Sequence, residues 1–331
     1  MTNGQPGTVV IIANPVAGAG LAGRLRPRLE EDLRRAGYGV RFVETRARGD
    51  ARAEAGRSAD AAAVVAVGGD GTVNEILNGL PLPDAPPLAV VPAGTANVMA
   101  KELGIPRDVP GVEQLAEALA QLLSPSARRP KRGAPPARTE GERAAWIVPA
   151  LAAGRVARID VGLANGRRFA CMAGAGLDAR VVRVLDAGRT GPTSMGQYPI
   201  WALQALVGYR PPRIGVVVDG REVADDAGFV IAASSVSYGG AFTFTPDARL
   251  DDGVLDVAVF RGRGIDELVR WLAAAWLGRA DEDRLCRIVR GREVRLESAG
   301  EVDLQVDGDP AGTLPATIEV REKALAVLVP A

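Results

Sequence analysis

The chain has 331 residues, of which 47% are apolar, and this length suits one large domain or two ordinary ones. Its 40 basic and 40 acidic residues cancel, so the charge gives no reason to expect a nucleic-acid partner. The chain contains no histidine, which excludes imidazole general bases, Ser-His-Asp triads and imidazole metal sites, and leaves acid–base chemistry to carboxylates, Lys, Tyr or Cys.

The first part of the chain alternates between strand and helix patterns. Apolar, β-branched runs predict strands at residues 8–13, 39–44, 61–67 and 88–91. Helical spacing predicts helices at residues 21–36, 50–58, 72–79, 96–103 and 114–123. Continuous apolar strands that alternate with helices predict a parallel sheet covered on both faces, in an α/β domain over residues 1–124.

A proline-rich, mainly basic stretch then interrupts the pattern, and we assign a linker or exposed loop to residues 125–157. Its basic cluster, residues 128–132, predicts a solvated loop or, alternatively, a patch for anionic lipid headgroups. Residues 158–331 are strand-rich, with hairpin turns at Asn165-Gly166 and Asp219-Gly220. Further strands at 229–235, 254–260, 293–297, 302–306, 316–322 and 324–328 predict a β-sandwich, interrupted by helices at 199–208 and 265–277.

Glycine-rich turns follow three strands of the predicted parallel sheet, at residues 14–20, 68–75 and 92–97. The carboxyl ends of parallel strands meet at one edge, where open α/β folds bind ligands. Glycine lets the backbone approach a phosphate closely, and a helix N-terminus offers N–H groups to it. Asp70 would repel a phosphate unless a cation shared the site, so the turns predict phosphate chemistry with a metal. The alternative is that they are only tight turns.

Two acidic turns lie in the second domain. Asp251 and Asp252 precede a strand and could ligate a hard cation, although a turn with solvated acids is the alternative. Asp307-Gly308 has the pattern of a hairpin turn, and a carboxylate held at such a turn could accept a proton from a substrate hydroxyl.

Together these motifs resemble the bacterial diacylglycerol kinase catalytic-domain family, which includes sphingosine, ceramide and YegS-like lipid kinases. The resemblance covers nearly the whole chain, through NPVAG at residues 14–18, GGDGTVNEILNGL at 68–80, PAGTAN at 92–97, DVG at 160–162, GLDA at 176–179, DDGVLDV at 251–257 and VDG at 306–308. NAD kinases share the GGDGT turn, but they do not resemble this chain in the NPVAG motif at 14–18, in the VNEILNG continuation at 73–79 or in the DDGVLDV motif at 251–257. The resemblance implies an α/β domain with a parallel sheet, an antiparallel β-sandwich, and an active site in the cleft between them.

The resemblance also implies ATP and Mg²⁺ as cofactors and a lipid hydroxyl as the phosphate acceptor. Asp309 would accept the hydroxyl proton, with Asp70 and Asp307 as the other catalytic residues. Mg²⁺ would bind the Asp252 carboxylate and the backbone oxygens of Arg249 and Val254, and Asp160 would extend the acidic network. ATP would contact Asn14, Pro15, Gly18, Thr45, Gly68, Gly69, Gly71, Thr72, Asn74, Glu75, Thr95 and Asn97.

Two residues depart from the family pattern: Val98 stands where an aspartate is frequent, and Asp309 where glutamate is usual. These two departures give weight to one alternative function, a non-catalytic nucleotide- or lipid-binding homologue. The other alternative is an NAD kinase-like phosphotransferase, since NAD kinases share the GGDGT turn. The acceptor could be diacylglycerol, phosphatidylglycerol, a sphingoid base or another long-chain alcohol. We expect a cytoplasmic protein that meets its lipid at the inner membrane face and binds no nucleic acid. The sequence is compatible with a homodimer.

Overall fold

The structure is a computed structural model that describes residues 7–107, 139–187, 204, 209–239, 242–262 and 264–331. The chain forms two units, and each is described by itself. One comprises Met1–Val109, Arg132–Ile159 and Lys323–Ala331, and the other Pro110–Lys131 and Asp160–Glu322. These bounds differ from the predicted ones because the C-terminal residues return to the first sheet. Three predicted features lie outside the described residues: the helix at 114–123, the basic cluster at 128–132, and the helix at 199–208, of which only Gln204 is described.

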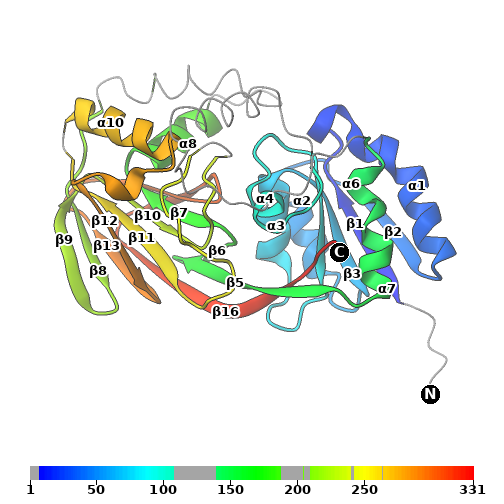
Figure 1. Cartoon of the computed structure of the whole chain (residues 1–331). Helices are drawn as coiled ribbons and strands as arrows, with labels where there is room; N and C mark the ends of the chain where they lie inside the picture. The colour runs from blue at the N-terminus through cyan, green and yellow to red at the C-terminus, as the bar shows by residue number, and fades with distance from the viewer. Residues whose placement is uncertain (1–6, 108–138, 188–203, 205–208, 240–241, 263) are drawn as a thin grey trace. The chain divides into compact units, whose positions relative to one another are not determined.

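The first unit is built on a parallel sheet (Figure 1). Its strands have the order β2 (Gly39–Glu44), β1 (Thr8–Ala13), β3 (Ala63–Gly68) and β4 (Leu88–Pro92). Val327, near the end of β16 (Ala316–Leu328), pairs with Leu88 of β4, also in parallel. All residues of β3 and β4 are buried, as expected for strands covered on both faces.

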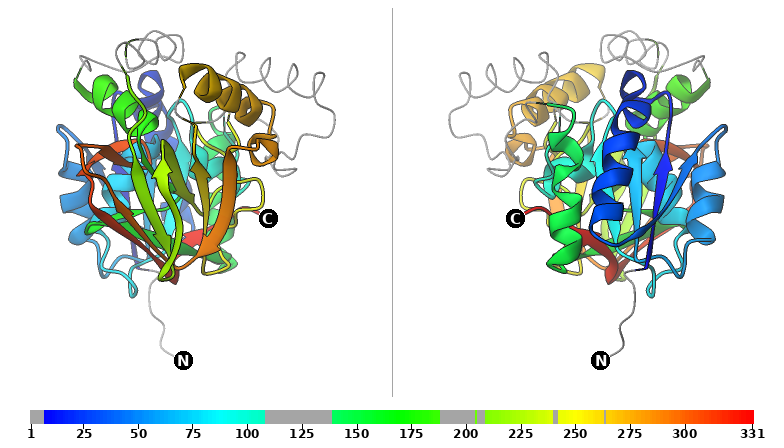
Figure 2. Two further views of the ribbon diagram at one scale, coloured as in Figure 1. Left: turned by 90° about the vertical axis from the view of Figure 1, so that its left-hand side faces the viewer. Right: turned by 90° about the vertical axis from the view of Figure 1, so that its right-hand side faces the viewer.

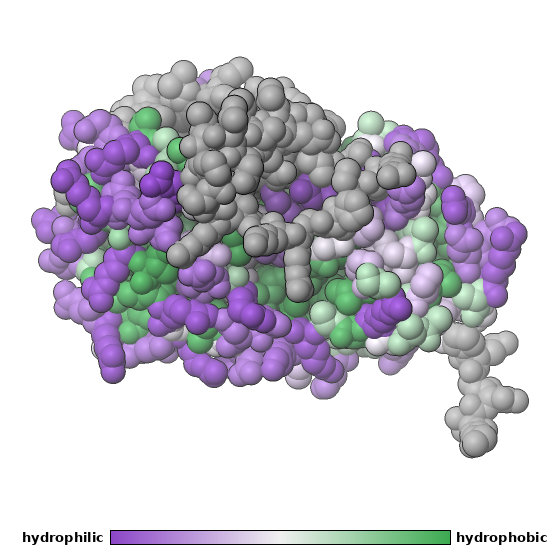
Figure 3. Space-filling model, in the orientation of Figure 1, coloured by the Kyte–Doolittle hydropathy of each residue, from purple (hydrophilic) through white to green (hydrophobic). Residues whose placement is uncertain are grey.

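Helices cover both faces of this sheet. On one face lie α1 (Leu21–Arg35), α6 (Glu142–Ala145) and α7 (Ile147–Ala152), and on the other α2 (Asp50–Gly56), α3 (Asp70–Gly79) and α4 (Val98–Glu102) (Figures 1 and 2). Four leucines of α1 form its buried stripe: Leu21, Leu25, Leu29 and Leu33. Its outer face carries i,i+4 ion pairs such as Arg26–Glu30, and is hydrophilic in Figure 3. The predicted covered parallel sheet is confirmed, and α6 and α7 occupy part of the predicted linker.

The second unit contains two antiparallel sheets, which confirms the predicted β-sandwich. One sheet has the order β12-β11-β10-β7-β14-β15, and the other β16-β13-β8-β9 with β5 and β6 beside β16. Their bounds are β5 Val156–Ala164, β6 Arg167–Phe169, β7 Met172–Ala175, β8 Ile214–Val218, β9 Arg221–Ala227, β10 Phe229–Ala233, β11 Leu255–Phe260, β12 Cys286–Gly291, β13 Glu293–Glu297, β14 Asp303–Val306 and β15 Asp309–Thr313. The two strands predicted between 316 and 328 are the single strand β16, in which Lys323 has a φ of +49°.

Aliphatic side chains and Phe169 fill the space between the two sheets, among them Ile214, Val230, Val257, Leu296, Leu304 and Ile318. The other face of the six-stranded sheet is covered by α8 (Leu177–Ala187) and α10 (Ile265–Trp276) (Figures 1 and 2). Trp271 of α10 stacks on Phe260 with ring centroids 4.5 Å apart and meets Phe229 edge-on at 5.1 Å. Across the described residues, no helix has both the length and the apolar character needed to span a bilayer.

Candidate functional site

The three predicted glycine-rich turns meet at one edge of the parallel sheet. Hydrogen bonds between the strands continue into the turns: the N–H of Asn14 donates to the Val67 carbonyl at 2.9 Å, and the N–H of Ala93 donates to the Gly68 carbonyl at 2.8 Å. The ends of β1, β3 and β4 are therefore held side by side, and the turns that follow them lie next to one another. This arrangement matches the expectation for a ligand-binding edge of an open α/β sheet.

The first turn packs against the third. Gly18 has a φ of +57°, and a Cβ placed on it would lie 3.2 Å from the Ala93 carbonyl oxygen, so glycine is favoured there by both conformation and space. Thr45, at the end of β2, reaches the same edge, because its N–H donates to the Ala13 carbonyl at 2.9 Å.

The second and third turns touch backbone to backbone. A Cβ on Gly94 would lie 2.5 Å from the Gly69 Cα, and a Cβ on Gly69 would lie 2.9 Å from the Gly94 Cα, so neither position tolerates a side chain without movement. Helix α3 starts at Asp70, directly after Gly69, so the N–H groups of its first turn have no partner within the helix. These groups and the positive end of the helix dipole favour an anion at this point.

The Asp70 carboxylate joins the starts of two helices. Its Oδ1 accepts a hydrogen bond from the Val98 N–H, at the start of α4, at 2.8 Å. The contact of position 98 with Asp70 is therefore made by the backbone N–H. It does not require the aspartate side chain that the family often has at this position. The Val98 side chain is buried.

Several predicted ATP contacts shape the turns through their side chains. The Asn97 Oδ1 accepts the Gly94 N–H at 2.9 Å, and its Nδ2 donates to the Gly94 carbonyl at 2.6 Å. Thr72 is buried against Gly68, where an added Cβ would lie 2.5 Å from the Thr72 Cβ. These two side chains hold the backbone that would face a nucleotide.

Asn74, Glu75 and Asn14 also make internal contacts. Asn74 is buried and its Oδ1 lies 3.2 Å from the Asn78 Nδ2. The Glu75 Oε2 accepts the Gly49 N–H at 3.0 Å, and the Asn14 Oδ1 accepts the Val16 N–H at 3.1 Å. Among the other predicted contacts, Pro15, Gly18 and Gly71 are exposed, and Gly69 and Thr95 are half-buried.

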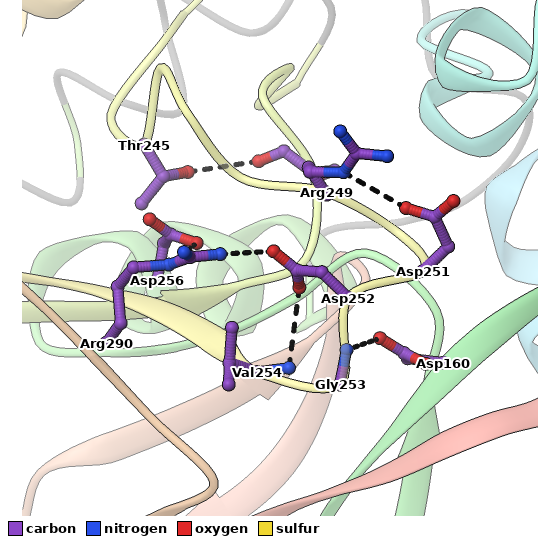
Figure 4. Close-up of polar contacts among 10 residues, drawn as sticks. Asp160, Thr245, Arg249, Asp251, Asp252, Gly253, Val254, Asp256 and Arg290 are labelled. Atoms are coloured by element: carbon purple, nitrogen blue, oxygen red, sulfur yellow. Dashed lines mark hydrogen bonds and ion pairs between the residues drawn. The ribbon is translucent and has the colours of Figure 1, made fainter.

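Figure 4 shows the predicted metal-binding turn of the second unit. Asp252 forms an ion pair with the Arg290 guanidinium, and the Arg290 Nε lies 3.4 Å from the Asp256 Oδ2. Val254 directs its N–H at the Asp252 Oδ1, at 3.4 Å. Burial raises the pKa of Asp256, and the Arg290 guanidinium opposes that rise.

The other acids of this turn are also engaged. Asp160 is fully buried, and its Oδ2 accepts the Gly253 N–H at 2.7 Å. Asp251 lies 3.2 Å from the Arg249 guanidinium. Within the described ranges, no group of three or more His, Cys, Asp or Glu residues could hold a metal ion. The carboxylates of Asp252 and Asp160, both predicted to lie at the Mg²⁺ site, are thus paired with groups of the protein, and Asp160 holds the turn through Gly253.

Asp307 is an anchor for a neighbouring loop. Its carboxylate accepts backbone N–H groups from Ala170 at 2.7 Å, Cys171 at 3.0 Å and Met172 at 2.9 Å. Three backbone donors to one carboxylate give Asp307 a structural role in holding this segment, and the catalytic role predicted for it stays a prediction.

Asp309 lies two residues further on, at the start of β15. Its side chain is 15% exposed, and its Oδ2 lies 3.9 Å from the Arg167 guanidinium. The carboxylate thus combines partial exposure with a nearby positive charge, in a strand whose preceding turn is fixed. This geometry suits the acceptor role predicted for Asp309 better than the geometry of Asp307 does.

A buried polar network that sequence reasoning missed supports this turn. The Gln305 Oε1 accepts the Gly308 N–H at 2.8 Å, and its Nε2 donates to the Asp178 Oδ2 at 2.9 Å. The Tyr238 hydroxyl donates to the same Asp178 oxygen at 3.0 Å. Burial raises the pKa of Asp178 to about 6. Asp178 stands in the GLDA motif and Gln305 lies two residues before Asp307, but neither position by itself signals a contact.

Two family profiles match the chain. The diacylglycerol kinase catalytic domain matches residues 8–128, and the YegS C-terminal NAD kinase beta sandwich-like domain matches residues 171–329. The chain belongs to the diacylglycerol kinase catalytic-domain family. This is a family of lipid kinases, so the predicted family and enzyme class are confirmed.

Relatives of this family align along almost the full length. The diacylglycerol kinase of Bacillus subtilis (strain 168) is 26% identical over 325 residues, covering 97% of this chain and 95% of the relative. A solved diacylglycerol kinase from Bacillus anthracis str. Sterne has a TM-score of 0.68 at 23% identity, covering 99% of this chain and 98% of the other. An NAD kinase from Archaeoglobus fulgidus, solved in complex with ATP, has a TM-score of 0.50 at 13% identity, covering 97% and 93%. These solved structures share the fold.

Proposed function

We propose that this member of the diacylglycerol kinase family transfers the γ-phosphate of ATP to a hydroxyl group of a lipid such as diacylglycerol. The observation that carries the proposal is the contact of three glycine-rich turns at one sheet edge, with the Gly69 and Gly94 backbones touching at the start of α3. The name of the Bacillus subtilis relative supports a lipid acceptor, and the ATP complex of the archaeal NAD kinase supports the nucleotide.

In this proposal the phosphates of ATP accept hydrogen bonds from the backbone around Gly69 and Gly71, next to the turn that contains Gly18. Asn97 and Thr72 keep the turns in place for that contact. The Asp70 carboxylate lies at the same helix start and, with phosphate oxygens, suits a hard divalent ion. Mg²⁺ bound with ATP would neutralise charge on the phosphates. Such reactions depend on positioning and charge stabilisation more than on covalent work by the protein.

The acceptor hydroxyl would lose its proton to Asp309. A bond forms between the lipid oxygen and the γ-phosphorus, the bond from that phosphorus to the bridging oxygen of ADP breaks, and the hydroxyl proton passes to the Asp309 carboxylate. Arg167 places a positive charge 3.9 Å from this carboxylate. The Gln305 Oε1 accepts the Gly308 N–H and the Asp307 carboxylate accepts the Met172 N–H, so both side chains hold the turn that precedes Asp309.

Because diacylglycerol is a membrane lipid, the enzyme would meet it at a membrane surface, as a peripheral protein on the cytoplasmic side. The acceptor class and the nucleotide can be tested together. The full chain is incubated with labelled ATP, Mg²⁺ and vesicles that contain diacylglycerol, phosphatidylglycerol or a sphingoid base, and in parallel with NAD. We expect a phosphorylated lipid, identified by its mass. Transfer of the label to NAD would instead favour an NAD kinase-like enzyme. ATP binding without transfer to any acceptor would favour a non-catalytic homologue.

Two substitutions assign the residues. Asp70→Ala should abolish lipid phosphorylation without unfolding the chain, whereas the control Asp60→Ala, at an exposed position before β3, should leave activity unchanged. Asp309→Asn should lower turnover by about 10²- to 10⁴-fold, as for loss of a general base, with little effect on ATP affinity. Full activity of Asp70→Ala would refute the nucleotide site, and wild-type turnover of Asp309→Asn would remove it as the base.

A further inference from the structure

A side chain of this protein already neutralises part of the charge of the acidic turn before β11. Asp252, at 21% exposure, and Asp256, at 3%, both face the Arg290 guanidinium (Figure 4). Arg290 forms an ion pair with Asp252 and places its Nε 3.4 Å from Asp256. The Arg290 guanidinium therefore contacts two carboxylates at the position where the family resemblance implies a magnesium ion.

The sheet register explains why Arg290 reaches this turn. Strands β11 and β12 are antiparallel, and Asp256 is paired directly with Arg290. Directly opposite residues of such strands lie close together, so their side chains meet on one face. The guanidinium is planar and presents several N–H donors, which allows it to bind two carboxylates at once, as a lysine ammonium could not do with the same geometry.

The other polar groups of the turn are engaged within the protein. Mg²⁺ prefers six oxygen ligands in near-octahedral geometry. Val254 presents an N–H to Asp252, and the Asp160 oxygen accepts the Gly253 N–H inside the protein. A divalent cation at Asp252 would also meet the positive charge of Arg290, which lies within ion-pair distance of that carboxylate.

We propose that the Arg290 guanidinium takes the place of a divalent metal ion at Asp252 and Asp256. Its contacts connect the turn to β12, and the second unit therefore needs no metal ion to fold. The proposal does not depend on the kinase activity. It concerns the structural site alone and leaves the ion that accompanies ATP untouched.

Thermal unfolding of the full chain without nucleotide tests the proposal. The wild-type protein should have the same Tm in EDTA and in millimolar MgCl₂. Arg290→Gln should lower the Tm in EDTA by about 4 °C, because two carboxylates lose their partner, and Mg²⁺ should restore part of that loss. The control Arg287→Gln changes an exposed arginine of the same strand and should leave both the Tm and its response to Mg²⁺ unchanged.

Two results would overturn the proposal. One is a wild-type Tm that falls in EDTA and recovers with Mg²⁺, which would show that a metal binds in spite of Arg290. The other is an Arg290→Gln protein as stable as Arg287→Gln. If Arg290→Gln does not fold, the variant Asp252→Asn tests the proposal instead. Its Tm should be lower than that of the wild type and should not respond to Mg²⁺. An unchanged Tm would contradict the stabilising role of the Asp252–Arg290 ion pair.

Discussion

The buried carboxyl of Asp178 gives a sharp test of the polar network behind the Asp309 turn. Its Oδ2 accepts hydrogen bonds from Gln305 and Tyr238, and its Oδ1 is buried with no partner among the described atoms. An amide in place of the carboxyl keeps an oxygen for both donors and cannot ionise. Asp178→Asn therefore resembles the protonated carboxyl at every pH.

The size of the effect follows from the pKa. Burial raises the pKa of Asp178 from 3.8 to about 6 in the folded protein, and one pKa unit corresponds to about 1.4 kcal/mol. Between these two values the folded state binds more protons than the unfolded state, so the wild type loses stability as the pH rises. The loss is complete above the folded pKa and amounts to about 3 kcal/mol.

Calorimetric unfolding of the wild type and of Asp178→Asn at several pH values measures this loss. The difference between the two proteins removes the contributions of the other titrating groups. We expect the variant to gain stability relative to the wild type as the pH rises from about 4 to 7, by about 3 kcal/mol. Asp225→Asn, at an exposed position of β9, is the control and should show no such trend. A difference that is constant over this range would refute the reasoning.

Two further predictions concern the turns. Gly94→Ala would place a Cβ 2.5 Å from the Gly69 Cα, so calorimetric titration should show ATP affinity at least tenfold weaker, or about 1.4 kcal/mol. The control Gly23→Ala, in an open position of α1, should bind ATP as the wild type does. Equal ATP affinities of Gly94→Ala and the wild type would contradict the importance of the contact. Asp307→Asn should lower the free energy of unfolding in denaturant by about 2–4 kcal/mol, because one amide oxygen cannot accept hydrogen bonds from all three N–H groups. The control Asp309→Asn should unfold like the wild type. Equal stability of the two variants would contradict the structural role of Asp307.

The edge where the turns meet was predictable from the sequence because its signals are local. An apolar run that stops at Gly68-Gly69 predicts a buried strand and a tight turn, and a parallel sheet then brings such turns together. The hairpins at Asn165-Gly166 and Asp219-Gly220 were predictable for the same reason. The contact between Gly69 and Gly94 is a consequence of this pattern in three dimensions.

The second unit was less predictable because its key contacts join distant segments. Gln305 and Asp178 are 127 positions apart, and Arg290 and Asp252 are 38 apart, so no spacing rule connects them. Strand β7 consists of Met172–Ala175 and carries no β-branched residue, which explains why it was not predicted. The pairing of charges across a sheet appears only once the register is known.

The same limit applies to the acidic turn. Asp252 and its neighbours have the composition of a cation site, and composition alone cannot show which cation they bind. The register of β11 and β12 places Arg290 opposite Asp256, and this pairing changes the interpretation of the turn.

The nucleotide site can be tested directly by a crystal structure of the full chain with Mg²⁺ and a non-hydrolysable ATP analogue. We predict phosphate oxygens within hydrogen-bond distance of the backbone N–H groups at Gly69 to Gly71, with Asp70 beside the ion. A nucleotide bound elsewhere, with these three turns left empty, would contradict the account.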